Sequence, residues 1–358
     1  MPSLKEIKGR INSISSTLAI TSAMKMVAAA KLQKAQMAIQ NMLPYERRLH
    51  SMLIDLMGAM NISAAASEDG SVRGSGSAER GFDQSGDRLS LSNRHDLAGM
   101  DGAYSLMAQR EVRKVAIVAF ASNSSLCGAF NSNAIREATA VINEYRASGL
   151  RDSDIVVYSV GRKMAEAMKK LGFPSPADFT KMSDSPSYEA ASALAQELLD
   201  GFVSGRFDKV ELVYNHYKST SSQPTTRQTY LPLSLADATA DLQAGKITDS
   251  ASESDTNRGA EPVGAPVVRQ GSPTTEDLIV EPSKEELIVT LLPKVVRLRV
   301  FTTLLDSTAA EHAARTVAMQ LATDNGNDLL QELTLEYNKG RQQKITSEIL
   351  DLVGGSMQ

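Results

Sequence analysis

Apolar and small side chains recur every three or four residues along the first part of the chain, from Leu4 to Met42. The series is broken only at Lys25 and consists of Leu4, Ile7, Ile11, Ile14, Leu18, Thr21, Ala28, Leu32, Ala35, Ile39 and Met42. This spacing gathers the side chains into one stripe, which is typical of a helix in a coiled coil. A helix of about 40 residues is roughly 60 Å long, so one small globule cannot bury it. Pro44 predicts a kink, beyond which the helix continues from Arg48 to Met60.

The end of the chain predicts a second long helix. Between Lys294 and Val353 there is no proline, and the only glycines are Gly326 and Gly340. One helix of about 60 residues, roughly 90 Å long, fits this stretch, and Pro293 suits its first turn, where a missing N–H does no harm. Its apolar line passes through Leu330, Leu333, Tyr337, Ile345, Ile349 and Leu352. Two long helices at the termini bury both apolar lines most simply against each other.

The middle of the chain predicts an α/β domain. Strands are expected at residues 115–120, 154–159, 209–214 and 226–233, and helices at residues 131–147, 163–171 and 188–202. Strands that alternate with helices indicate a largely parallel sheet covered on both faces.

Two segments, residues 62–104 and 236–276, are rich in Gly, Ser and Asp and are predicted to be long surface loops. The expected division is a first coiled-coil helix (1–60), a flexible insertion and connection (61–110), an α/β domain (111–235), a long flexible loop (236–282) and a second coiled-coil helix (283–358).

Composition excludes some classes of function. The 358 residues include 38 Lys and Arg and 42 Asp and Glu, a net charge of −4, which argues against a dedicated nucleic-acid binder. The single cysteine, Cys127, allows no intrachain disulfide and favours a reducing compartment. No secretory signal is visible and no apolar run approaches the roughly 20 residues of a membrane span, so contact with a membrane would go through a partner. Lys25, Lys31 and Lys34 form either a cationic stripe for an acidic partner or a solvated face.

Candidate chemistry is sparse. No Gly-rich loop ends in Gly-Lys-Ser/Thr, so binding of nucleotide phosphates through such a loop is not expected. The four histidines, His50, His95, His216 and His312, lie in separate segments without metal-ligand spacing. Cys127 lies between a strand and a helix, where a nucleophile is often placed, but a buried packing role is the favoured interpretation. We therefore expect no catalytic residue, no metal site and no cofactor.

Three groups of segments carry a resemblance to a known family. Residues 7–31 near the start, residues 311–325 and 337–349 near the end, and the internal segments 126–128, 160–162 and 214–219 resemble the gamma subunit of F-type ATP synthase. The resemblance implies that the terminal helices form a shaft, a long antiparallel coiled coil, and that a central Rossmann-like α/β domain forms its foot.

The resemblance also implies a function. In such a complex the chain is the central rotor shaft inside a ring of three alpha and three beta subunits, and it contacts the epsilon subunit and the membrane c-ring. Proton-driven rotation of that ring is coupled to conformational change at the catalytic sites of the alpha and beta subunits, for ATP synthesis or hydrolysis. The chain itself has no catalytic site, and it is expected on the cytoplasmic face of the bacterial inner membrane as a peripheral subunit.

Residues that match the family's rotor-coupling contacts occur on both terminal helices. They are Met24, Lys25, Arg315, Gln342, Thr346 and Glu348. The chain departs from the family at Asn123-Ser124-Ser125, where Asp-Arg-Gly is common, which argues against a salt bridge from this loop to the ring.

The last turns of the second helix are apolar. Ile345, Ile349, Leu350, Leu352 and Val353 precede the uncharged Gly354-Gly355-Ser356. With the resemblance, they are expected to be an apolar shaft tip that turns in an apolar collar. The alternative is that they only continue the coiled-coil stripe, from which Leu350 and Val353 deviate.

Two other classes of function remain open. A coiled-coil scaffold protein explains the long helices but not the string at residues 337–349. An α/β nucleotide-binding enzyme explains the central domain, but it leaves the phosphate loop missing and gives the long helices no purpose.

Overall fold

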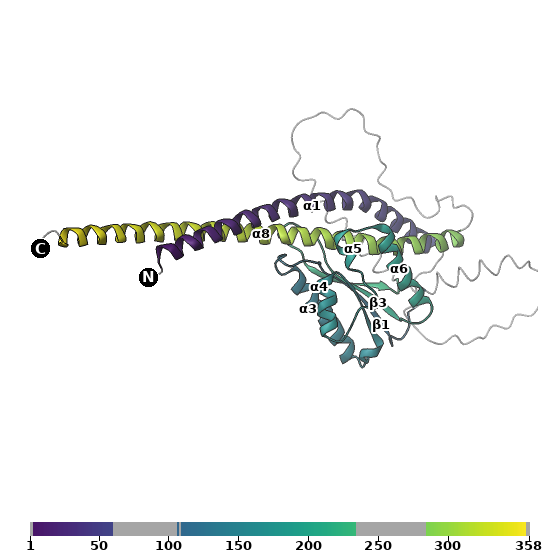
Figure 1. The fold of residues 1–358 in the computed structure, drawn as a ribbon. Helices are drawn as coiled ribbons and strands as arrows, with labels where there is room; N and C mark the ends of the chain where they lie inside the picture. Colours follow the sequence, from purple (N-terminus) through teal and green to yellow (C-terminus); the bar gives the residue numbers. More distant parts are fainter. Residues whose placement is uncertain (1–2, 60–105, 107–108, 234–283, 356–358) are drawn as a thin grey trace, which may run out of the picture.

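Two long helices lie side by side and antiparallel, and a globular domain packs against one half of the pair (Figure 1). The computed structural model describes residues 3–59, 106, 109–233 and 284–355. The helices are α1 (Leu4–Ala59) and α8 (Lys284–Gly355). The predicted long antiparallel coiled coil is therefore confirmed. The C-terminal part of α8 extends beyond the N-terminus of α1 (Figure 1).

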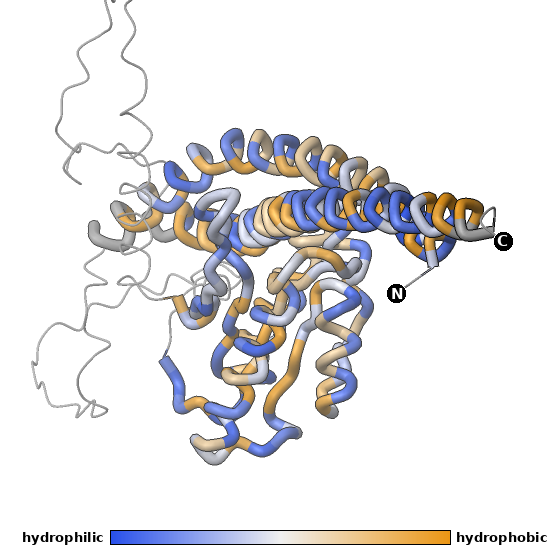
Figure 2. The backbone as a smooth tube through the Cα atoms, turned by 90° about the vertical axis from the view of Figure 1, so that its left-hand side faces the viewer, coloured by the Kyte–Doolittle hydropathy of each residue, from blue (hydrophilic) through white to orange (hydrophobic). Residues whose placement is uncertain are grey.

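The predicted apolar stripe of α1 faces α8. All its members are buried or half-buried, and polar segments alternate with the apolar ones along both helices (Figure 2). Thr21 and Thr323 are hydrogen-bonded through their hydroxyls at 3.1 Å. A Cβ at Gly326 would lie 2.7 Å from Leu18 Cδ2, and one at Gly340 would lie 3.1 Å from Leu4 Cδ2. Both glycines thus let the helices approach closely.

One of the two proline predictions needs correction. α1 continues beyond Pro44 to Ala59, as predicted, but α8 begins at Lys284, so Pro293 lies inside the helix and not in its first turn. A proline inside a helix costs about 3 kcal/mol. Apolar side chains near each proline are buried in the core of the globular domain, Leu49 and Leu53 after Pro44, and Ile288 and Leu292 before Pro293. This burial offsets the lost backbone hydrogen bond.

The sheet has four strands in the order β2-β1-β3-β4. They are β1 (Val115–Phe120), β2 (Ile155–Val160), β3 (Lys209–Asn215) and β4 (Thr225–Leu231), each within two residues of its predicted bounds. β1 is parallel to β2 and to β3, but β4 is antiparallel to β3, which the sequence did not predict. The segment between β3 and β4 is shorter than the dozen residues that a parallel crossover needs, so β4 returns as a hairpin.

Side chains of β1 alternate between two apolar layers. Val115, Ile117 and Ala119 pack beneath α3 (Phe130–Ala147) and α4 (Arg162–Lys170). Ala116, Val118 and Phe120 pack with α6 (Tyr188–Val203) and with the ends of α1 and α8 that lie over the domain. The two long helices thus form part of one wall of the domain core.

Two short elements were not predicted, the 3-10 turn η1 (Asp152–Asp154) and the helix α5 (Thr180–Asp184). The predicted loops at 62–104 and 236–276 lie outside the described residues. Among the helices that the structure describes, none combines the length and the apolar character needed to cross a membrane.

Gly161, before α4, yields a stability prediction. Its φ is +99°, and a Cβ would lie 2.0 Å from the carbonyl oxygen of Ala121. We expect Gly161→Ala to lower the free energy of unfolding by more than about 3 kcal/mol, because left-handed strain and a backbone clash add. Urea unfolding of the full chain measures this.

The matched control is Gly149→Ala, because Gly149 has a φ of +94° and open space around its Cβ position. It should cost only about 1–2 kcal/mol. Equal losses in the two variants would show that the contact with Ala121 contributes nothing.

Candidate functional site

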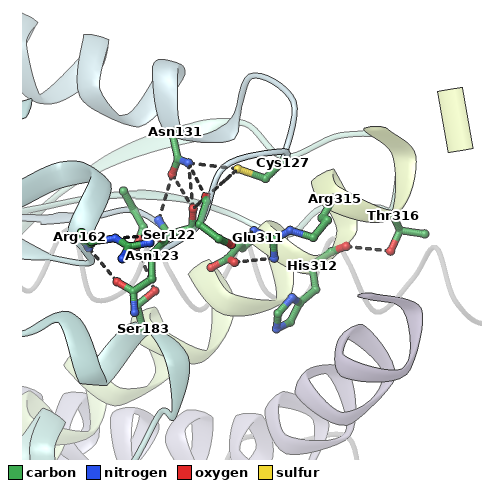
Figure 3. Close-up of polar contacts among 12 residues, drawn as sticks. Ser122, Asn123, Cys127, Asn131, Arg162, Ser183, Glu311, His312, Arg315 and Thr316 are labelled. Carbon is green, nitrogen blue, oxygen red and sulfur yellow. Dashed lines mark hydrogen bonds and ion pairs between the residues drawn. The ribbon is translucent and has the colours of Figure 1, made fainter. Parts of the chain in front are cut away.

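The loop at residues 121–129 lies at the carboxyl ends of β1 and β2, where α/β domains usually bind ligands. Asn131 Oδ1 accepts hydrogen bonds from the backbone N–H and the hydroxyl of Ser122, each at 3.0 Å, and Asn131 Nδ2 lies 3.1 Å from Cys127 Sγ (Figure 3). Cys127 is 1% exposed and packs with Phe130 and with alanines of α8. Burial of this thiol supports the packing role and not a nucleophile.

The N-terminus of α4, where an anion would bind in many α/β proteins, is occupied by Asn123. Asn123 Oδ1 accepts from the backbone N–H of Arg162 at 2.7 Å, and the Arg162 guanidinium donates to the Asn123 carbonyl at 2.7 and 3.1 Å (Figure 3). Asn123 Nδ2 donates to the carbonyl of Thr180 in α5 at 2.7 Å. The chain's own groups therefore fill the position that a nucleotide phosphate would need.

A buried ion pair on α8 contacts the same loop. Arg315 Nη1 lies 2.7 Å from Glu311 Oε1, and Arg315 Nη2 donates to Ser124 Oγ at 2.7 Å (Figure 3). Glu311 is 7% and Arg315 8% exposed. Burial raises the pKa of Glu311, although the neighbouring guanidinium acts in the opposite direction. Arg315 thus ties α8 to the loop after β1.

His312, the next residue along α8, is half-buried and uncharged near neutral pH. Burial lowers the pKa of its imidazole to about 4, and the positive charges of Arg315 and Lys31 act in the same direction. Among the described residues its buried Nδ1 has no hydrogen-bond partner.

A second polar contact joins the globular domain to both long helices. In the turn after β3, His216 Nδ1 lies 2.6 Å from Asp306 Oδ2 of α8, and the backbone N–H of Tyr217 donates to Asp306 Oδ1 at 2.9 Å. Gln36 Nε2 of α1 donates to the hydroxyl of Tyr217 at 2.6 Å.

The residues predicted as rotor-coupling contacts fall into two groups. Met24 and Lys25 are half-buried on α1. Because Thr21 faces Thr323, they lie between one and two turns of α8 from the level of Arg315. Gln342, Thr346 and Glu348 are exposed, about 40 Å or more along α8 from Arg315. The structure does not bring the two groups together.

The predicted shaft-tip residues lie beyond the end of α1, since Gly340 is already level with Leu4. Their side chains are between 48% and 75% exposed, namely Ile345, Ile349, Leu350, Leu352 and Val353. The coiled-coil stripe of this chain therefore ends before them. Their role as a tip stays a prediction.

In the described part of the chain, no group of three or more His, Cys, Asp or Glu side chains is placed to hold a metal ion. His50 is buried on α1, His216 pairs with Asp306, and His95 lies outside the described residues.

Comparison with known proteins decides between the classes of function. A family model described as ATP synthase matches residues 3–357. The ATP synthase gamma chain of Phocaeicola vulgatus is 47% identical over 357 residues, which span all of both chains. The chain belongs to the ATP synthase gamma chain family. The gamma chain of Bacteroides thetaiotaomicron is 45% identical over 358 residues, again over all of both chains, and that of Flavobacterium johnsoniae is 36% identical over 99% of this chain and 98% of its own.

Solved structures of more distant chains support the fold. A chain in a Euglena gracilis mitochondrial ATP synthase structure, described as OSCP/F1/c-ring in rotational state 3, has a TM-score of 0.52 at 18% identity, covering 99% of this chain and 93% of its own. A chain of the rotor of the same enzyme in rotational state 1 gives 0.51 at 19% identity, covering 96% and 98%.

Several of the gamma chain's polar contacts were not predicted from the sequence. Glu311 and Arg315 are four residues apart on a predicted helix, so their ion pair could have been predicted from this spacing. Ser124 was noted only as a departure from the family. The contacts of Asp306 and Gln36 could not be predicted from the sequence pattern, because their partners are distant in sequence.

The state of His312 yields a pH prediction. Its folded pKa, about 4, lies below the value of about 6.5 for an unfolded histidine, so its contribution to stability is complete above pH 6.5 and is lost as the pH falls toward 4. Going from pH 7 to 5, wild type should lose about 1 kcal/mol more than His312→Gln, a figure discounted for partial exposure.

Urea unfolding at both pH values, with NMR titration of the imidazole, checks this. Because Glu311 is present in both proteins, its opposite pH dependence cancels in the comparison. A His312 titration midpoint between pH 6 and 7 would contradict the prediction.

Proposed function

We propose that this chain is the central rotor shaft of an F-type ATP synthase. It couples proton-driven rotation of a membrane ring to conformational change at the catalytic sites of the surrounding alpha and beta subunits. The observation that carries the proposal is the extension of α8 beyond α1, residues 341–355, on a chain of this family. A projecting, largely exposed helix on a rigid globular base is the shape that an axle inside a ring requires.

An asymmetric rod explains how one chain controls several catalytic sites. It cannot present the same surface to three beta subunits at once, so each site is held in a different conformation and affinity. A turn of the rod exchanges those states, because each orientation favours a different conformation of a given subunit. The chain performs no bond chemistry in this scheme.

The coupling contacts are proposed on the two groups described above. Met24 and Lys25 are half-buried and still reachable from outside the coiled coil, and Gln342, Thr346 and Glu348 lie on the bare part of α8. Arg315 differs, because its guanidinium is bound within the chain by Glu311 and Ser124. Its contribution is therefore to hold the foot, the globular domain, against the shaft.

Partners and place follow from this role. The shaft stands within three alpha and three beta subunits, and the foot contacts the epsilon subunit and the c-ring. The complex places the chain on the cytoplasmic face of a bacterial inner membrane, to which it is bound only through other subunits.

Reconstitution tests the function. The purified chain alone should hydrolyse no ATP, and added to alpha and beta subunits it should form one complex with rotation-linked ATPase activity. Substantial ATP turnover by the chain alone would favour the nucleotide-binding enzyme. A folded chain that binds neither subunit would favour the scaffold protein.

The shaft tip yields a second test. Leu350→Asp with Val353→Asp should leave the isolated chain folded, because these side chains are 64% and 50% exposed. Assembly with alpha and beta subunits should weaken about 100-fold, roughly 2.7 kcal/mol, because two charges are desolvated in an apolar collar without partners. Circular dichroism and a binding titration measure the two quantities.

The control for the tip is Leu350→Ala with Val353→Ala, which removes apolar area but adds no charge. It should assemble within about tenfold of wild type. If the Asp pair assembled and coupled like wild type, these residues would not be a bearing surface.

A further inference from the structure

We infer that His216, Tyr217, Asp306 and Gln36 form a torque clamp, a polar junction that transmits rotation from the foot to both helices of the shaft. The inference rests on the proposed rotor function. It assigns a positioning role to four residues that are not among the proposed coupling contacts. Three of its contacts connect one turn of the foot with α1 and α8.

Asp306 is the centre of the clamp. Its two carboxylate oxygens are taken by two consecutive residues of the turn, Oδ2 by the His216 imidazole at 2.6 Å and Oδ1 by the Tyr217 backbone N–H at 2.9 Å. The Asp306 side chain is 18% exposed, so water competes little for it. A carboxylate held at both oxygens resists rotation and sliding of the turn along α8.

Tyr217 extends the clamp to the second helix. Its hydroxyl accepts from Gln36 of α1 at 2.6 Å. Its ring packs on the coiled-coil interface around Leu32 and Ala309, and also on the cluster that contains Cys127 and Phe130 of the foot. One side chain thus touches both helices of the shaft and the foot.

Hydrogen bonds hold the turn after β3 to the rest of the foot, so a force on the foot is transmitted to the clamp. Asn215 Nδ2 donates to the carbonyl of Phe130 at the start of α3 at 3.0 Å, and Thr225 Oγ1 donates to Asn215 Oδ1 at 2.7 Å. The His216 backbone N–H donates to the carbonyl of Pro224 at 2.9 Å. These bonds connect the residues next to the clamp with the sheet and with α3.

Most of the buried surface at this junction is apolar. Other hydrogen bonds between the foot and the shaft, Arg315 to Ser124, Arg297 to Gln196 and Tyr230 to the carbonyl of Val296, reach α8 but not α1. The foot buries Leu198, Phe202 and Tyr230 together with Leu49 of α1 and Leu292 of α8. Apolar burial holds two bodies together but is non-directional. Hydrogen bonds and ion pairs fix the angle between them.

The charge of His216 sets the strength of the clamp. Asp306 on α8 raises the pKa of the imidazole, burial and Lys218 of the same turn oppose it, and α1 contributes the neutral Gln36. The attraction is complete below pH 6.5 and is lost as the pH rises through the folded pKa. A lysine at this position would keep its charge throughout that range.

The experiment uses the whole complex in membrane vesicles and measures ATP hydrolysis and proton pumping in the same preparation. Asp306→Asn should lower the protons pumped per ATP by about twofold or more while assembly is retained. His216→Gln should give an intermediate loss. His216→Lys should restore wild-type coupling and stay constant between pH 6.5 and 8.5, a range in which coupling by wild type falls.

The matched control is Asp152→Asn. Asp152 pairs with Arg146 at 2.7 Å on the foot, close to the 2.6 Å of His216 and Asp306. Its loss therefore removes an ion pair of similar length that does not involve the shaft. Tyr217→Phe keeps the ring and removes the bond of the hydroxyl to Gln36, together with its longer contact of 3.5 Å with Thr220 of the same turn. This variant tests the clamp if Asp306→Asn does not assemble. It should lower coupling without affecting assembly.

The outcomes are distinct. Equal coupling in Asp306→Asn and Asp152→Asn would overturn the clamp, and so would wild-type coupling in both Tyr217→Phe and His216→Gln. Failure of the wild-type chain to support pumping in a complex with alpha and beta subunits would instead overturn the proposed rotor function.

Discussion

The structure depends on the burial of one apolar stripe of α1 against α8. Neither helix buries its own apolar line, so each is stabilised by the other along most of its length. Small residues make the approach possible, since Ala309 and Ala313 are fully buried beside Leu32, and Gly326 receives Leu18. The register set by these contacts also decides how much of α8 extends beyond α1.

The same two helices complete the core of the globular domain. Leu53 and Leu56 of α1 and Ile288 and Val296 of α8 belong to the cluster that covers one face of the sheet. The domain therefore shares its core with the coiled coil. Polar contacts at Arg315 and Asp306 then fix its orientation, so a load on the domain is carried by a single body.

Much of this fold was predictable from the sequence, because its signals are local. β1 was predicted at its observed bounds, since a strand buried on both faces is a continuous apolar run. The stripe of α1 repeats often enough to identify every member. The position of Pro293 was misjudged because its local preference for a first turn is outweighed by burial of neighbouring side chains in a core that a single segment does not reveal.

The candidate site was less predictable, for a related reason. His216 and Asp306 are ninety positions apart, and Ser124 and Arg315 are further apart still, so only the folded chain shows these contacts. The roles predicted for Met24 and Gln342 rest on family resemblance and on no physical signal of their own.

The exposed end of α8 affects how the chain behaves before it is assembled with other subunits. Five apolar side chains near this end are 48–75% exposed to water, namely Ile345, Ile349, Leu350, Leu352 and Val353. Exposed apolar patches are adhesive, and they favour contact between copies of the same protein when the intended neighbour is absent. An unassembled copy is therefore prone to self-association through this end of α8. The fraction lost to aggregation in a cell depends on how soon after synthesis each copy meets its partner subunits.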